Sequence, residues 1–187
     1  MPTIAIELND GGVTIARQGT LLPESPGYAL VDGEHLVVGA EARDRARLQP
    51  RHVYNRFWDR LALDPLPRPT PAARTQADLA CAHLAHIWHY VREGADGVVF
   101  AVPGSFSRTQ LGLLLGIAQS CSIPVLGMVD AAVAATPASD GSRKLVHVDL
   151  QLHRAVVTGL RFDASLMRTS VGPPASRVSS ISSASCW

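Results

Sequence analysis

Three histidines are the first residues whose type and spacing could do chemistry. His83, His86 and His89 follow one another at intervals of three, so two of them on one helix could share a metal ion. The apolar residues of the same segment recur at spacings of three and four and define a buried helical stripe: Ala77, Ala80, Leu84, Ile87, Trp88 and Val91. Helical angles place the histidine row mostly away from that stripe. We therefore expect three solvated histidines and no metal site.

A run of arginines raises the question of nucleic-acid binding. Eight arginines and three acidic residues lie between Arg43 and Arg74, with Tyr54, Phe57 and Trp58 among them. Arginines spread over a helix and its loop more often form a solvated face with local ion pairs than a nucleic-acid surface. We expect no nucleic-acid partner.

The elements that position these residues are clearest between Gly97 and Ala135. Val98 to Val102 is a short, β-branched, apolar run and predicts a buried strand. Ser107 and Gln110 have the spacing of a capping box, which predicts a helix to about Cys121. A second strand is expected at Val125 to Val129 and a small-residue helix from Asp130 to Ala135. Strand, helix, strand and helix in this order predict a parallel crossover of the α/β class.

Two hairpins are predicted before that crossover. Asn9-Asp10-Gly11-Gly12 separates β-rich segments at 4–8 and 13–17, and asparagine and glycine favour a tight turn there. A second hairpin, 28–31 with 36–38, turns at Asp32-Gly33, and a helix opens within 38–42. Residues 64–71 hold four prolines and predict an extended loop, and a last strand pair is expected at 145–149 and 155–160.

Composition narrows the class of protein. The chain has 187 residues, a net charge of +1 and 47% hydrophobic residues, enough for a folded core. Its three cysteines are widely spaced and odd in number, which favours a reducing compartment without a disulfide framework. The N-terminus has no basic start followed by a long apolar run, and no apolar stretch is long enough to span a bilayer. We expect a cytoplasmic protein without a membrane partner.

The crossover also resembles a known family. Val102, Pro103, Ser105, Phe106, Gln110, Ala118 and the segment 125–135 resemble the stretch Val-Pro-Ala-Tyr-Phe-Asn-Asp-Ala-Gln, then Asn-Glu-Pro-Thr-Ala-Ala-Ala, of the seventy-kilodalton heat-shock chaperones. The likeness extends more weakly from Ile4 to about Leu160, and the segment 38–42 is similar to a family Val-Gly-Glu-Ala-Ala. The family belongs to the actin, sugar-kinase and heat-shock ATPase superfamily. The resemblance implies a ribonuclease-H-like, actin-like ATPase lobe with a mixed five-stranded sheet and crossover helices.

The resemblance places a first phosphate loop at the turn after residue 8. The family has Asp-Leu-Gly-Thr-Thr there, whereas this chain has Glu7-Leu8-Asn9-Asp10-Gly11, followed by Gly12. By resemblance Glu7 supplies the carboxylate near a metal-bound water, and Asn9, Asp10, Gly11 and Gly12 line the phosphates. Asp10 would set a negative charge beside a polyphosphate. An ordinary hairpin turn is the alternative.

The second phosphate position falls between the last two predicted strands. The family has Asp-Leu-Gly-Gly-Gly-Thr, and the chain has Asp149-Leu150-Gln151-Leu152-His153-Arg154, which keeps the aspartate and lacks the glycines. By resemblance Asp149 is a catalytic carboxylate, and Gln151, His153 and Arg154 are phosphate contacts. Side chains in place of glycines obstruct that approach.

Two further family positions are altered. Asp130 lies where the family has the glutamate of Asn-Glu-Pro-Thr, and it either replaces that catalytic carboxylate or is a plain helix N-cap. The family carries a catalytic lysine near residues 56–60, but no lysine precedes Lys144, so only Arg56 or Arg60 could stand there.

The resemblance divides the chain into three parts. Residues 1–140 form a first ATPase lobe, 141–162 the opening strand pair of a second lobe, and 163–187 a Ser-rich, poorly ordered tail. The adenine-contacting part of the second lobe has no counterpart, so we expect a truncated product with weak or no ATPase activity. Three functions stay open. One is a heat-shock-chaperone-like domain that binds ATP with Mg and serves a protein client or partner, and another is a non-catalytic scaffold or assembly module with decayed phosphate loops. The third is a different nucleotide-handling enzyme of the same superfamily, such as a kinase, although no sugar site is identified.

Overall fold

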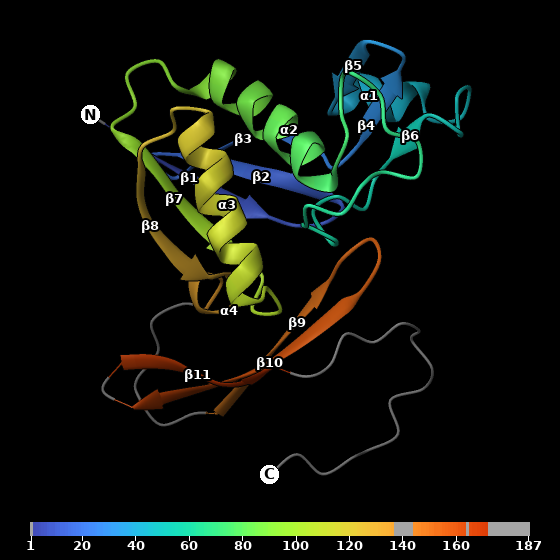
Figure 1. Cartoon of the computed structure of the whole chain (residues 1–187). Coiled ribbons are helices and arrows are strands. Elements are labelled where there is room, and N and C mark those ends of the chain that lie inside the picture. The colour runs from blue at the N-terminus through green and yellow to red at the C-terminus, as the bar shows by residue number, and fades with distance from the viewer. Residues whose placement is uncertain (1, 137–143, 164, 172–187) are drawn as a thin grey trace, which may run out of the picture.

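A mixed five-stranded sheet carries the fold in the computed structural model, which describes residues 2–136, 144–163 and 165–171 (Figure 1). The strand order is β3 (Thr20–Pro26), β2 (Gly12–Arg17), β1 (Thr3–Leu8), β7 (Gly97–Val102) and β8 (Val125–Asp130). β2 runs antiparallel to both of its neighbours, whereas β1, β7 and β8 are parallel. The expected α/β class with a mixed five-stranded sheet is therefore confirmed.

The predicted crossover is present between the parallel strands β7 and β8. Its helix, α3 (Arg108–Ser120), begins with the expected capping box: the Gln110 amide donates to Ser107 Oγ at 3.2 Å, and the Ser107 amide donates to Gln110 Oε1 at 3.0 Å. Each bond satisfies an amide that the first helical turn leaves without a partner. After β8, the short helix α4 (Ala131–Ala134) follows as predicted.

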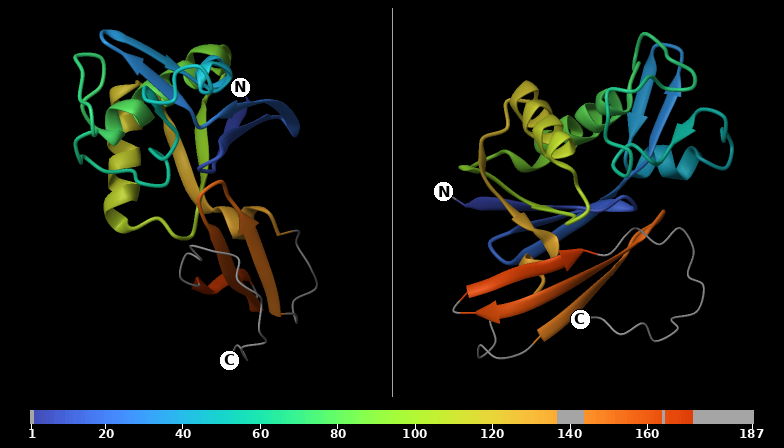
Figure 2. Two further views of the ribbon diagram at one scale, coloured as in Figure 1. Left: turned by 90° about the vertical axis from the view of Figure 1, so that its right-hand side faces the viewer. Right: turned by 60° about the horizontal axis from the view of Figure 1, so that its bottom comes forward.

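Helix α2 (Gln76–Val91) lies beside α3 on one face of the sheet (Figures 1 and 2). Its apolar stripe is buried as expected, and one continuous core joins it to the inward side chains of β1, which are Ile4, Ile6 and Leu8. Arg17 of β2 donates to the carbonyls of Val91 and Glu93 at the C-terminal end of α2. Buried side chains alternate along β1, whereas those of α2 recur every three or four residues. Both sets pack into the same core layer.

A second, three-stranded sheet has the order β5 (His35–Val38), β4 (Ala29–Asp32) and β6 (Val53–Tyr54), with α1 (Ala40–Arg45) following β5. The predicted turn at Asp32-Gly33 is present, and Gly33 has a φ of 60° that favours glycine. The predicted helix opening at 38–42 is confirmed by α1. The connection from β6 to α2 includes the proline-rich segment 64–71, which has no helix or regular strand.

The third sheet has the order β11 (Ser165–Val171), β10 (Ala155–Asp163) and β9 (Lys144–Leu150), and Figure 2 shows it on the side of the five-stranded sheet away from α2 and α3. β9 and β10 confirm the last predicted strand pair. β11 lies within the segment expected to be a poorly ordered tail, and backbone pairing with β10 makes Ser165–Val171 a strand instead. Residues 172–187, the rest of that expected tail, lie outside the described residues.

Besides β11, two strands, β3 and β6, were not predicted from the sequence. β3 contains Pro23 and Pro26 and stands at the edge of its sheet, where a residue without an amide hydrogen is tolerated. β6 is only two residues long, too short for any periodicity to appear.

The expectation of three solvated histidines is wrong for His83, which is fully buried, while His86 and His89 are exposed. Trp58 Nε1 donates to His83 Nδ1 at 3.0 Å, so the remaining ring nitrogen carries the proton and donates to Ser25 Oγ at 2.7 Å. Both polar atoms are satisfied, which is what allows burial. A nitrogen that already carries a proton cannot accept one from Ser25, so this pair is structural rather than a nucleophile with its base.

Burial, and secondarily the charge of His86, lowers the pKa of His83 to about 3. In the unfolded chain a histidine titrates near pH 6.5, so acid protonates the unfolded state first. We predict that the free energy of unfolding falls by on the order of 1 kcal/mol per pH unit as pH drops below about 6.5. In urea melts at several pH values, His83→Gln should be less stable at pH 7.5 but lose this pH dependence, whereas His89→Gln should keep it. Equal slopes for wild type and His83→Gln would contradict the assignment.

Candidate functional site

The two expected phosphate positions meet through the buried carboxylate of Asp10, whose residue is 2% exposed. Asp10 Oδ1 accepts from the Leu152 amide at 2.6 Å, and Asp10 Oδ2 accepts from the His153 amide at 2.9 Å. Successive amides that converge on one anion form the same arrangement that binds phosphate in many proteins. Here the anion is a side chain of the first loop.

Local turn geometry aims Asp10 at the opposite loop. Asn9 and Gly12 exchange backbone hydrogen bonds at 3.1 and 3.2 Å, and Asn9 Oδ1 accepts from the Gly11 amide at 2.9 Å. Gly27 packs directly behind the turn, where a Cβ would lie 2.8 Å from the Asp10 carbonyl oxygen. The hairpin interpretation of residues 9–12 is therefore confirmed. The hydrogen bonds of this turn and its packing against Gly27 fix the backbone at Asp10, whose side chain is buried.

The turn between β9 and β10 also contacts the segment that follows β6. His153 Nε2 lies 3.0 Å from the Asn55 carbonyl oxygen, and Arg154 Nε lies 3.5 Å from Asp59 Oδ1. The Arg154 and Asp59 side chains are 10% and 13% exposed, so solvent screens this ion pair less than a surface pair. Figure 1 shows this turn pointing from the third sheet toward the connection between β6 and α2.

The remaining member of the second loop, Gln151, bonds within the loop. The side-chain nitrogen Nε2 of Gln151 donates to Asp149 Oδ2, and Gln151 Oε1 accepts from Arg154 Nε at 3.0 Å. The predicted phosphate contacts Gln151, His153 and Arg154 therefore lie together, but each makes hydrogen bonds within the protein.

Glu7 and Asp149, the two carboxylates expected at the site, interact electrostatically. Partial burial raises the pKa of Glu7, the charge of Asp149 raises it further, and His147 acts in the opposite direction. Glu7 also lines a small cavity of about 200 Å³ between β1 and α4, whose other walls are mostly alanines. The structure thus brings Glu7 near Asp149 on the face of the sheet opposite α2 and α3.

Asp130 acts as a helix N-cap in this structure. Its Oδ1 accepts from the Ala132 amide at 2.9 Å, at the start of α4. It lines a different cavity from Glu7, next to Val102, Pro103 and Met128. Glu7 and Asp130, two of the three predicted catalytic residues, therefore line different cavities.

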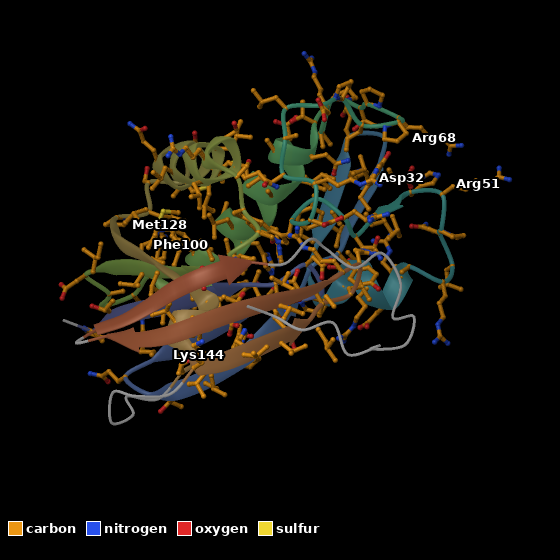
Figure 3. All side chains as sticks on the ribbon, turned by 90° about the horizontal axis from the view of Figure 1, so that it is seen from below. Asp32, Arg51, Arg68, Phe100, Met128 and Lys144 are labelled. Atoms are coloured by element: carbon orange, nitrogen blue, oxygen red, sulfur yellow. The ribbon has the colours of Figure 1, made fainter. Side chains whose placement is uncertain are left out.

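Arg56 and Arg60, the candidates for the vacant lysine position, line a cavity of about 330 Å³ with Arg51 and Arg68. Arg56 pairs with Asp59 at 3.1 Å, and Figure 3 shows Arg51 and Arg68 at the outer margin of the molecule. These arginines are exposed, as a solvated face predicts. Asn55, Asp59 and Gly27 are site residues that sequence reasoning missed, since no motif marks them.

Within the described ranges, no group of three or more His, Cys, Asp or Glu side chains is arranged to hold a metal ion. No helix among those residues combines the length and apolarity needed to cross a membrane. No protein-family model matches the chain, and no curated protein matches it.

We predict that Asp10→Asn destabilises the protein by about 2 kcal/mol or more, because one carboxylate oxygen becomes an amide nitrogen that faces a backbone donor. The free energy of unfolding from urea melts at pH 7 measures this. Asp64→Asn is the matched control, because Asp64 is exposed, and it should change stability by less than about 0.5 kcal/mol. Equal effects of the two substitutions would contradict the role given to Asp10.

A second prediction concerns Glu7. Asp149→Asn should lower the pKa of Glu7 by removing a neighbouring negative charge, yet leave it above its ordinary value because partial burial remains. Carboxyl-carbon NMR titration of Glu7 in both proteins measures the change, with Asp64→Asn as control. An unchanged Glu7 titration in Asp149→Asn would show that the two carboxylates are not neighbours.

Proposed function

We propose that the chain is a non-catalytic relative of the seventy-kilodalton heat-shock ATPases. In this proposal residues 1–140 form a first lobe of actin-like fold and the strands after residue 141 open a second lobe. The protein serves as a scaffold or assembly module for a protein partner or client, and it hydrolyses ATP weakly or not at all. The mixed five-stranded sheet and the crossover helix between β7 and β8 support the fold assignment.

One observation carries the non-catalytic assignment. The Leu152 and His153 amides, which the resemblance aligns with phosphate-binding glycines, already donate to Asp10. A phosphate would have to displace a buried carboxylate that makes two short, charge-assisted bonds, and it would meet that negative charge at close range. The arrangement therefore does not fit a bound triphosphate.

In this proposal the Asp10 contacts give the two degenerate loops a structural role, which is to connect the two lobes. Where a nucleotide would join the two loops, the chain supplies its own anion and joins them permanently. In this proposal the contact ties the first lobe to the opening strands of the second without a ligand, which suits a scaffold better than a nucleotide-driven switch.

An ATP-binding protein is the second candidate, and the closeness of Glu7 to Asp149 favours it. By resemblance these carboxylates hold the hydration shell of Mg, and Asp130 orients the attacking water. For this function the Asp10 carboxylate must leave the second loop when ATP binds.

Calorimetric titration of the full chain with magnesium-ATP distinguishes the two candidates. We predict no saturable heat at millimolar nucleotide and no phosphate release above the rate in buffer. Circular dichroism on the same sample establishes that the chain is folded. Saturable binding that Asp149→Ala abolishes would contradict the non-catalytic assignment and favour the second candidate.

A further inference from the structure

Two cysteines that are 40 residues apart in sequence meet on the helical face of the fold. Cys81 lies on α2 and Cys121 caps the C-terminus of α3, and their sulfur atoms are 3.6 Å apart. Both are free thiols with partly exposed side chains. Each also packs against the core that α2 and α3 share.

We propose that Cys81 and Cys121 are a modification site at which a low-molecular-weight disulfide, such as glutathione disulfide, forms a reversible cross-link between α2 and α3. A disulfide needs its sulfurs about 2.05 Å apart, so the two atoms must approach by about 1.6 Å. The two helices that carry the cysteines already pack against each other, which favours such an approach. The inference is independent of the proposed function, since it uses neither phosphate loop.

The contacts of the two thiols set the order of the exchange. Cys121 Sγ donates to the Cys81 carbonyl oxygen at 3.6 Å. Burial, and then the contact with Cys81, raises the pKa of the Cys121 thiol to about 12, so it holds its proton at neutral pH. Only a thiolate attacks a disulfide, and the Cys121 thiol proton is engaged by the Cys81 carbonyl oxygen, so we assign the first attack to Cys81.

The exchange then balances in two steps. The Cys81 thiolate attacks one sulfur of glutathione disulfide, breaks its S–S bond and releases one glutathione thiolate. Cys121 next gives its proton to solvent and attacks Cys81 Sγ, which releases the second glutathione. The protein loses two electrons and two protons, and one glutathione disulfide becomes two thiols.

The test uses the full chain carrying Cys186→Ser, because Cys186 lies outside the described residues and could form other disulfides. After equilibration with oxidised glutathione, we expect a mass loss of two hydrogens and a cross-linked peptide that joins Cys81 to Cys121. Dithiothreitol should reverse both. The cross-link closes a loop of 40 residues, so the oxidised protein should melt higher by about 10 °C.

Single substitutions in the same background test the order of attack. Cys121→Ser should keep a glutathione adduct on Cys81, because no second thiol resolves it. Cys81→Ser should form its adduct at least tenfold more slowly. Adducts on both cysteines without a cross-linked peptide, or a cross-link that lowers the melting temperature, would overturn the proposal. Equally fast adduct formation in the two variants would overturn the order of attack.

Discussion

The structure depends on one buried anion. The carboxylate of Asp10 is removed from water, and two backbone amides from residues more than 140 positions away compensate for that removal. A buried charge without such partners costs several kcal/mol, so the turn of β1 and β2 and the turn of β9 and β10 stabilise each other. His153 and Arg154 then fasten the same turn to Asn55 and Asp59. Three sheets are in this way joined at one point.

Under the proposed relation to the heat-shock ATPases, this constraint also accounts for the departures of both loops from the family motifs. A triple glycine leaves bare amides for a phosphate, whereas a chain that supplies its own carboxylate has no need of bare backbone. The side chains of Gln151, His153 and Arg154 are each used for contacts within the protein. Under the proposed relation, the departures in the two loops form one consistent set: Asp10 of the first loop would stand where a phosphate binds, and the side chains of the second loop stabilise the turn that contacts Asp10.

Local signals predicted much of the fold. The Ser107 and Gln110 spacing, the apolar stripe of α2, the Asp32-Gly33 turn and the strands at 4–8, 13–17 and 98–102 are all properties of short segments, and each is present. The site was predicted only in part, because its contacts join segments that no spacing relates. Asp10 was expected to line a phosphate site, but its contacts with the Leu152 and His153 amides join distant segments and could not be predicted from the sequence. His83 was expected in solvent, but its burial depends on Trp58, a distant residue that supplies the missing donor. β11 has no clear periodicity and is fixed by its pairing with β10.

Amide hydrogen exchange at Leu152 and His153, measured by NMR with and without magnesium-ATP, tests the central claim most directly. If Asp10 occupies the anion position, both amides exchange slowly in the free protein, and nucleotide changes neither their exchange rates nor their chemical shifts. Fast exchange in the free protein, followed by protection when nucleotide is added, would show instead that the two amides are kept for phosphate.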